Sequence, residues 1–222
     1  MDFVFGIDSV LLSDFAKKIR PGSIICDLGT GTGIISILLS KKIEKSKIIA
    51  IEKQIEVFDM AYRSIKLNNL EKDIEILNMD ILDIDKNLKV DVVVTNPPYK
   101  KLNTGVHSNN LKKQISRFES TANLNDWIQI SSRILKDFGE FYMVYRPERL
   151  TEVFRAMSEY NIEPKVIKFV HSKINEESTM VLIKGIKLAK PFLKIEKPLI
   201  IYNEDGSYTF EIYEIYNGGN NG

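Results

Sequence analysis

Short apolar runs alternate with longer segments of helical periodicity along most of the chain. Runs rich in β-branched residues predict buried strands at 23–28, 47–52, 74–79 and 90–95. Apolar residues at helical spacing predict helices at 9–19, 34–43, 54–68, 123–136 and 148–160. Three later strands are expected at 139–145, 165–171 and 179–184, which completes seven. This alternation is typical of an α/β fold, a mostly parallel sheet with helices on both faces.

A single domain is expected over residues 1–222, because no repeat or linker-like tract interrupts this alternation. Two stretches differ in character from the rest. Residues 100–120 are polar and rich in Asn, Ser and Lys, and we interpret them as a substrate loop. Residues 191–216 are interpreted as a C-terminal appendage, with two extended segments around Glu204-Asp205-Gly206 that predict a small hairpin.

The first apolar run leads into a glycine-rich turn, Asp27-Leu28-Gly29-Thr30-Gly31-Thr32-Gly33. Such a turn lets a ligand approach the backbone, and the helix start that follows presents free N–H groups. The spacing differs from a dinucleotide fingerprint, because position 34 is isoleucine, and no Lys-Ser/Thr pair marks a phosphate-binding loop. Asp27 would repel a pyrophosphate but suits a ligand with a cationic end. S-adenosylmethionine, with an amino group, a sulfonium and no phosphate, fits this description.

Two further carboxylates follow successive strands. Glu52 ends the second strand and is placed to accept from both ribose hydroxyls, and Asp80 follows the third and suits the adenine amino group. Each acid alone is more often a solvated surface residue. Ligands bind at the carboxyl ends of such strands, so the series predicts a cofactor site. The predicted cofactor-binding residues are Asp27, Gly29, Gly31, Gly33, Glu52, Asp80 and Asn96.

Asn96-Pro97-Pro98-Tyr99 directly follows the strand at 90–95 and is the most informative motif of the chain. An exocyclic purine amine or an amide is a poor nucleophile, because its lone pair is delocalised into the neighbouring π-system. The Asn96 side-chain oxygen and the Pro97 carbonyl can both accept from one NH2 group and favour a more tetrahedral nitrogen. Tyr99 offers a face for stacking a planar substrate. By itself the motif can equally be a turn, but with the glycine-rich turn upstream it predicts an N-methyltransferase.

The predicted mechanism is direct displacement at the sulfonium methyl group, which leaves S-adenosylhomocysteine as product. Asn96, Pro97 and Tyr99 are the predicted catalytic residues, because they position the amine and stack the base. A general base is not obligatory, since the nitrogen becomes strongly acidic once it has attacked.

The residues Asp27 to Gly33, Glu52, Asp80 and Asn96 to Tyr99 resemble the motif series of class I, seven-stranded S-adenosylmethionine-dependent methyltransferases that methylate amino groups. Three flanking segments resemble the bacterial tRNA1(Val) adenine-37 N6-methyltransferase family, and the resemblance covers nearly the whole chain. These segments are Phe5-Gly6-Ile7-Asp8-Ser9-Val10-Leu11-Leu12, Tyr145-Arg146-Pro147-Glu148-Arg149-Leu150 and Pro198-Leu199-Ile200-Ile201-Tyr202.

This resemblance implies a tRNA substrate and methylation of an anticodon-loop adenine at N6. Two departures are visible. The family commonly has Arg-His-Glu after the substrate loop, where this chain has Arg117-Phe118-Glu119, so Phe118 keeps an aromatic face but loses a titratable ring. The chain also begins almost on the Phe-Gly-x-Asp segment, from which we expect part of an N-terminal lid to be absent. The sequence does not indicate which tRNA or nucleotide is modified.

Composition narrows these possibilities only slightly. The 222 residues are 44% hydrophobic and 27% charged, with a net charge of +1, so RNA contacts require local basic patches. The predicted substrate-binding residues are Pro98, Tyr99, Lys100, Lys101, Arg117 and Arg146. The lysines can equally be solvated, and Arg146 and Arg149 can equally pair with Glu148 and Glu152.

Cellular context and assembly follow from weaker signals. The single Cys26 is expected to be a buried thiol, and no run of residues approaches a membrane span or a signal peptide. The two histidines lie apart from any ligand cluster, so no metal is expected. We therefore expect a cytoplasmic monomer.

Three alternatives to RNA adenine methylation are less favoured. The first is methylation of a protein glutamine, whose amide suits the Asn-Pro-Pro-Tyr motif as well as adenine does. Protein glutamine methyltransferases that act on release factors carry an extra N-terminal helical domain, however, for which we expect no room in this chain. DNA adenine methylation is disfavoured because the chain has no target-recognition domain. A non-catalytic binding module is disfavoured by the intact motifs.

Overall fold

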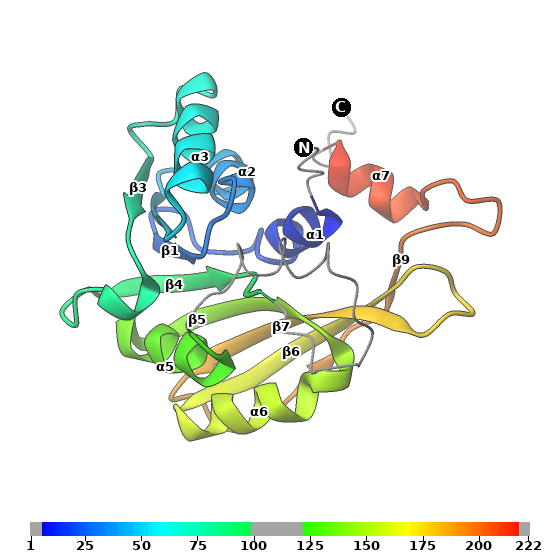
Figure 1. The fold of residues 1–222 in the computed structure, drawn as a ribbon. Helices are drawn as coiled ribbons and strands as arrows, with labels where there is room; N and C mark the ends of the chain where they lie inside the picture. Colours follow the sequence, from blue (N-terminus) through cyan, green and yellow to red (C-terminus); the bar gives the residue numbers. More distant parts are fainter. Residues whose placement is uncertain (1–5, 99–121, 218–222) are drawn as a thin grey trace, which may run out of the picture.

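The computed structural model describes residues 6–98 and 122–217, whose arrangement is drawn in Figure 1. The helices are α1 (Ile7–Phe15), α2 (Ile34–Lys42), α3 (Ile55–Leu67), α5 (Leu124–Ile134), α6 (Leu150–Glu159) and α7 (Phe210–Tyr216). The strands are β1 (Ile24–Leu28), β2 (Lys47–Glu52), β3 (Ile74–Asn78), β4 (Val90–Thr95), β5 (Leu135–Tyr145), β6 (Ile162–His171), β7 (Ser178–Lys187), β8 (Lys194–Ile195) and β9 (Leu199–Ile200). Short 3-10 helices are η1 (Ile81–Asp83) and η2 (Pro147–Arg149).

The strands form one mixed sheet in the order β3-β2-β1-β4-β5-β7-β6-β8, with β9 also paired to β6. β3, β2, β1, β4 and β5 are parallel, whereas β7 runs antiparallel between β5 and β6. The predicted α/β class and the seven main strands are confirmed. Chain order reverses at β1, which pairs with β2 on one side and β4 on the other. Ligands of open α/β sheets bind at the carboxyl ends of strands at such a switch point.

Helices cover both faces of the sheet (Figure 1). One core cluster joins the sheet to α1, α2, α3 and α7, and the other joins it to α5 and α6. Successive residues of β4 alternate between the two, with Val92 and Val94 in the first and Val93 in the second. Because the central strands are buried on both faces, they read as continuous apolar runs in the sequence. No helix in the described ranges is both long enough and apolar enough to span a membrane.

The C-terminal appendage departs from the prediction. β8 and β9 add short parallel pairings along β6, so the sheet has nine strands in the described residues. The expected turn is present, and an isolated antiparallel bridge joins Tyr202 to Tyr208. The prediction of a second extended segment after the turn is wrong, because the chain forms helix α7 from Phe210 onward. Ile212 and Ile215 lie three residues apart on one side of this helix, and both are buried in the cluster that contains α1. In a strand, residues three apart would point to opposite faces.

Candidate active site

The glycine-rich turn lies at the carboxyl end of β1. Gly29, Gly31 and Gly33 all have positive φ, at 68°, 58° and 84°. A Cβ atom at Gly31 would meet no atom of the described residues within 4 Å, so none of these residues blocks the approach of a ligand to the backbone there. The N–H of Thr30 donates to the Ile51 carbonyl at 2.9 Å, which holds the turn against the end of β2.

Asp27 is fully buried beneath this turn. Its Oδ2 accepts from the Thr30 hydroxyl at 2.6 Å and the Ser36 hydroxyl at 2.7 Å, but its Oδ1 is buried with no partner among the described residues. Burial raises the pKa of Asp27 to about 6, although the bonds from Thr30 and Ser36 act in the opposite direction. A buried carboxylate with one unsatisfied oxygen fits a cationic ligand, because such a ligand would supply the missing donor and charge.

Glu52 faces the same turn from the end of β2. Its Oε2 accepts from the Gly31 N–H at 3.0 Å and its Oε1 from the Gln54 N–H at 2.8 Å. Burial raises the pKa of the Glu52 carboxyl, and these backbone donors partly offset the effect. A carboxylate has about four lone-pair sites, so Glu52 can still accept from ligand hydroxyls beside these backbone donors.

Asp80 lies at the next strand end and is engaged by its surroundings. Its Oδ1 accepts from the Leu82 N–H at 3.1 Å, which caps η1, and its Oδ2 pairs with Lys53 Nζ at 2.7 Å. The side chain of Asn78 donates to the carbonyls of Glu52 and Lys53, at 2.9 and 3.0 Å, and so holds the ends of β2 and β3 together. The structure thus brings Glu52 and Asp80 to one edge, and contact of Asp80 with an adenine amino group stays a prediction.

The Asn96 motif begins beside the glycine-rich turn. Thr95, the last residue of β4, is fully buried, and its hydroxyl donates to the Leu28 carbonyl at 3.0 Å. This bond joins the last residues of β4 and β1, so Asn96 and Gly29, which follow them, start two loops at neighbouring positions. Pro97 is buried and Pro98 is exposed.

The groups at this edge fit S-adenosylmethionine. Asp27 suits a cationic end, Glu52 suits a diol, and the open side of Gly31 allows close approach of a ligand to the backbone. Within the described ranges, no group of three or more His, Cys, Asp or Glu side chains is arranged to hold a metal ion.

Four of the predicted substrate-binding residues, Tyr99, Lys100, Lys101 and Arg117, lie outside the described residues.

The two arginines after β5 have partners within the protein. Arg146 is exposed and donates to the Thr179 carbonyl at 3.1 Å. Arg149 pairs with Glu152 at 2.6 Å, and it also donates to the buried Tyr145 hydroxyl at 2.7 Å. For Arg149 the pairing alternative is therefore the one observed, and contact of Arg146 with RNA stays a prediction.

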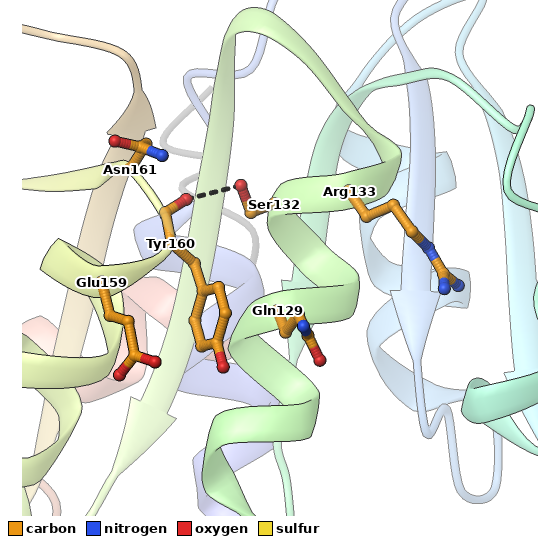
Figure 2. A pocket seen from close by; sticks show the side chains of 6 residues that line it. All are labelled: Gln129, Ser132, Arg133, Glu159, Tyr160 and Asn161. Carbon is orange, nitrogen blue, oxygen red and sulfur yellow. Dashed lines mark hydrogen bonds between the residues drawn. The ribbon is translucent and has the colours of Figure 1, made fainter.

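A shallow hollow of about 350 Å³ lies away from this edge, between the ends of α5 and α6. Figure 2 shows its lining residues, which are Gln129, Ser132, Arg133, Glu159, Tyr160 and Asn161. The Ser132 hydroxyl on α5 donates to the Tyr160 carbonyl, just after α6, at 2.6 Å and so joins the two sides of the hollow. Asn161 precedes β6 and Arg133 nearly reaches β5, so the hollow borders the amino ends of these strands. None of the predicted site residues lines it.

Sequence reasoning missed the residues that support the site. Thr30 and Ser36 hold Asp27, Thr95 joins β4 to β1, and Asn78 fixes the end of β2. The spacing Asp27-x-x-Thr30 within a tight turn is a local signal that predicts the bond from Thr30 to Asp27. The roles of Asn78 and Thr95 depend on pairing between distant strands, which the sequence does not display.

Replacing Glu52 by glutamine tests the predicted ribose contact. The amide nitrogen cannot accept from the Gly31 N–H or from a hydroxyl. We therefore expect the affinity for S-adenosylhomocysteine, which carries the same ribose, to fall about 10- to 100-fold in isothermal titration calorimetry. The matched control is Glu56→Gln, at an exposed position on α3. Equal affinity of the two variants would remove Glu52 from the site.

Comparisons with known proteins show the family of the chain. The methyltransferase small domain family matches residues 7–165. A tRNA1(Val) (adenine(37)-N6)-methyltransferase of Histophilus somni is 30% identical over 210 residues, which cover 93% of this chain and 85% of that protein. The protein of the same name from Actinobacillus pleuropneumoniae is 26% identical over 206 residues, which cover 91% and 84%.

A solved structure confirms the fold. It is described as a predicted O-methyltransferase of Agrobacterium tumefaciens, and it matches with a TM-score of 0.74 and 23% identity over 95% of this chain and 96% of that chain. The order and directions of β1 to β7 are accordingly those of the class I methyltransferase fold. With its family match, its relatives and its fold in agreement, the chain belongs to the methyltransferase small domain family and, within it, to the tRNA1(Val) (adenine(37)-N6)-methyltransferases.

Proposed function

We propose that this protein transfers the methyl group of S-adenosylmethionine to the N6 amino group of an adenine in the anticodon loop of a tRNA. The names of the relatives support this substrate. The observation that carries the proposal is the hydrogen bond from the Thr95 hydroxyl to the Leu28 carbonyl. It joins the strand that leads to the amine-binding motif with the strand that leads to the cofactor turn.

The cofactor-binding part of the proposal rests on three carboxylates and the turn. Asp27 would hold the cationic amino acid end, Glu52 the ribose hydroxyls and Asp80 the adenine amino group, with Gly29, Gly31 and Gly33 forming the turn. When bound, S-adenosylmethionine supplies a methyl group on a cationic sulfur that a nitrogen lone pair can displace. The fixed hydroxyls of Thr30 and Ser36 keep Asp27 oriented.

The reactive amine is handled by the residues after β4. The Asn96 oxygen and the Pro97 carbonyl accept from the two N–H bonds of the adenine amino group, which draws the lone pair out of conjugation. Positive charge develops on this nitrogen during attack, and both acceptors stabilise it. Tyr99 and Pro98 would stack against the base, and the nitrogen then releases a proton to a carbonyl or water.

Binding of tRNA requires local basic groups, because the net charge of the chain is only +1. Lys100, Lys101, Arg117 and Arg146 are our candidates for contact with the phosphates beside a flipped-out base.

The test is transfer of a labelled methyl group from S-adenosylmethionine to small RNA from a strain that lacks this enzyme. We expect label in N6-methyladenosine after nucleoside analysis, and none when the RNA is digested with nuclease beforehand. RNA from a strain with the enzyme is the matched control, because its site is already methylated. Label in protein, or no label in RNA although the cofactor binds, would contradict the proposal.

A further inference from the structure

Trp127, the single tryptophan of the chain, contacts the glycine-rich turn. It lies in the first turn of α5 and is 4% exposed. A Cβ atom added to Gly29 would lie 2.6 Å from Cη2 of the indole, 3.2 Å from Cζ3 and 3.7 Å from Cζ2. The far edge of the ring therefore occupies the place where any other residue at position 29 would have its side chain.

The tryptophan is itself held firmly. Asn123 and Asp126 form a reciprocal capping box at the start of α5, in which the Asp126 N–H donates to Asn123 and the Asn123 N–H donates to Asp126. The Trp127 N–H donates to the Asn123 carbonyl at 3.2 Å, and the Trp127 carbonyl accepts from the buried Ser131 hydroxyl at 2.7 Å. The capped first turn fixes the backbone that carries the indole, and burial of the ring restricts its rotamers.

Gly29 is the first glycine of the glycine-rich turn at 27–33, which is the proposed cofactor turn, and its neighbours in the chain make contacts with the other parts of the site. Leu28 before it accepts from the Thr95 hydroxyl, and Thr30 after it donates to Asp27. Gly31, one residue further, donates to Glu52. A shift of Gly29 therefore moves the groups that bind the cofactor and the bond that leads to Asn96.

We propose that Trp127 is a positioning residue for the cofactor turn, and that packing of its ring edge against Gly29 keeps the turn in the conformation that binds S-adenosylmethionine. The proposal rests on the cofactor lying at this turn, which the Glu52→Gln variant tests separately. A turn that already has its binding conformation loses less conformational entropy when the ligand binds. Trp127 would therefore raise the affinity for the cofactor without contacting it.

Trp127→Phe removes the outer ring atoms but leaves an aromatic side chain in the core. We expect its dissociation constant for S-adenosylhomocysteine, measured by titration calorimetry, to rise about tenfold. Ile134→Ala is the matched control, because Ile134 is fully buried in the same cluster at the other end of α5. The control should lose thermal stability and keep its affinity within about twofold. Both are compared at a temperature where circular dichroism shows them folded.

A second experiment tests the contact itself. Gly29→Ala places a methyl group against the indole, and Trp127→Phe removes the atoms it would meet, so we expect Gly29→Ala to weaken binding several-fold less in the Trp127→Phe background. Gly31→Ala is the control. Its φ of 58° strains alanine, but no described residue lies within 4 Å of the added methyl group, so its effect should be the same in both backgrounds.

Three outcomes would overturn the inference: an unchanged affinity of Trp127→Phe, an affinity loss as large in Ile134→Ala, or equal effects of Gly29→Ala in the two backgrounds. If Glu52→Gln binds normally as well, the location of the cofactor site is wrong. If Glu52→Gln loses affinity and Trp127→Phe does not, only the role of Trp127 is wrong.

Discussion

Replacement of Asn96 by alanine is expected to lower methyl transfer by about a thousandfold or more while S-adenosylmethionine still binds with nearly normal affinity. The side-chain oxygen is the acceptor that draws out the lone pair of the amine, and alanine has no acceptor. Acceptors aimed at charge that develops only during reaction act on the rate and contribute little to ground-state binding. The neighbouring backbone, held by the Thr95 bond to Leu28, should keep its position in the variant.

Single-turnover transfer to tRNA measures the rate, and calorimetry with S-adenosylhomocysteine measures the affinity. Asn96→Asp is the matched control, because it keeps an acceptor oxygen of the same reach and should retain part of the rate. Near-normal turnover by Asn96→Ala would show that the mechanism assigned to this motif is wrong.

Replacement of Asp27 by asparagine should weaken S-adenosylmethionine binding about 100-fold or more and at the same time stabilise the free protein at neutral pH. The buried carboxylate is charged at pH 7, and one of its oxygens has no partner among the described residues. Its donors are neutral: the hydroxyls of Thr30 and Ser36 and the backbone of Ser36. Asparagine keeps one oxygen for Thr30 and Ser36 and carries no charge. It cannot neutralise a cationic ligand.

The pH dependence has a definite sign. The pKa of Asp27 is raised from an ordinary 3.8 to about 6, so the folded protein holds more protons than the unfolded chain between these values. The contribution of Asp27 to stability is therefore greatest below pH 3.8 and is lost as the pH rises through about 6. Removing the charge should raise the free energy of unfolding by about 1–3 kcal/mol near pH 7.5, with a smaller gain near pH 5.

Cofactor affinity should follow the opposite course. A cationic ligand favours the ionised carboxylate, so affinity should increase as the pH rises through about 6 in the wild type and stay flat in Asp27→Asn. Urea unfolding and calorimetry at the two pH values measure both effects. An Asp27→Asn variant that binds the cofactor as tightly as the wild type would show that this carboxylate does not hold the cationic end.

The sequence predicted the main elements well for a physical reason. Strand β2 was expected at 47–52 and is Lys47–Glu52, and helix α3 was expected at 54–68 and is Ile55–Leu67. Parallel strands buried on both faces must be apolar throughout, and an amphipathic helix must repeat its apolar positions, so both leave a local signal. The prediction for the C-terminal segment was wrong in its second half, because a turn signal at 204–206 does not indicate whether a strand or a helix follows.

The sequence by itself determined the fold class, the positions of the cofactor turn and the Asn96 motif, and the carboxylates at three strand ends, because these depend on residues adjacent in the chain. Only the tertiary structure decided what surrounds them. It placed the indole of Trp127 against Gly29, joined Thr95 to Leu28, and buried Asp27 with one oxygen that has no partner in the described part of the chain. Contacts between residues up to about a hundred positions apart depend on strand order and register, which no local pattern encodes.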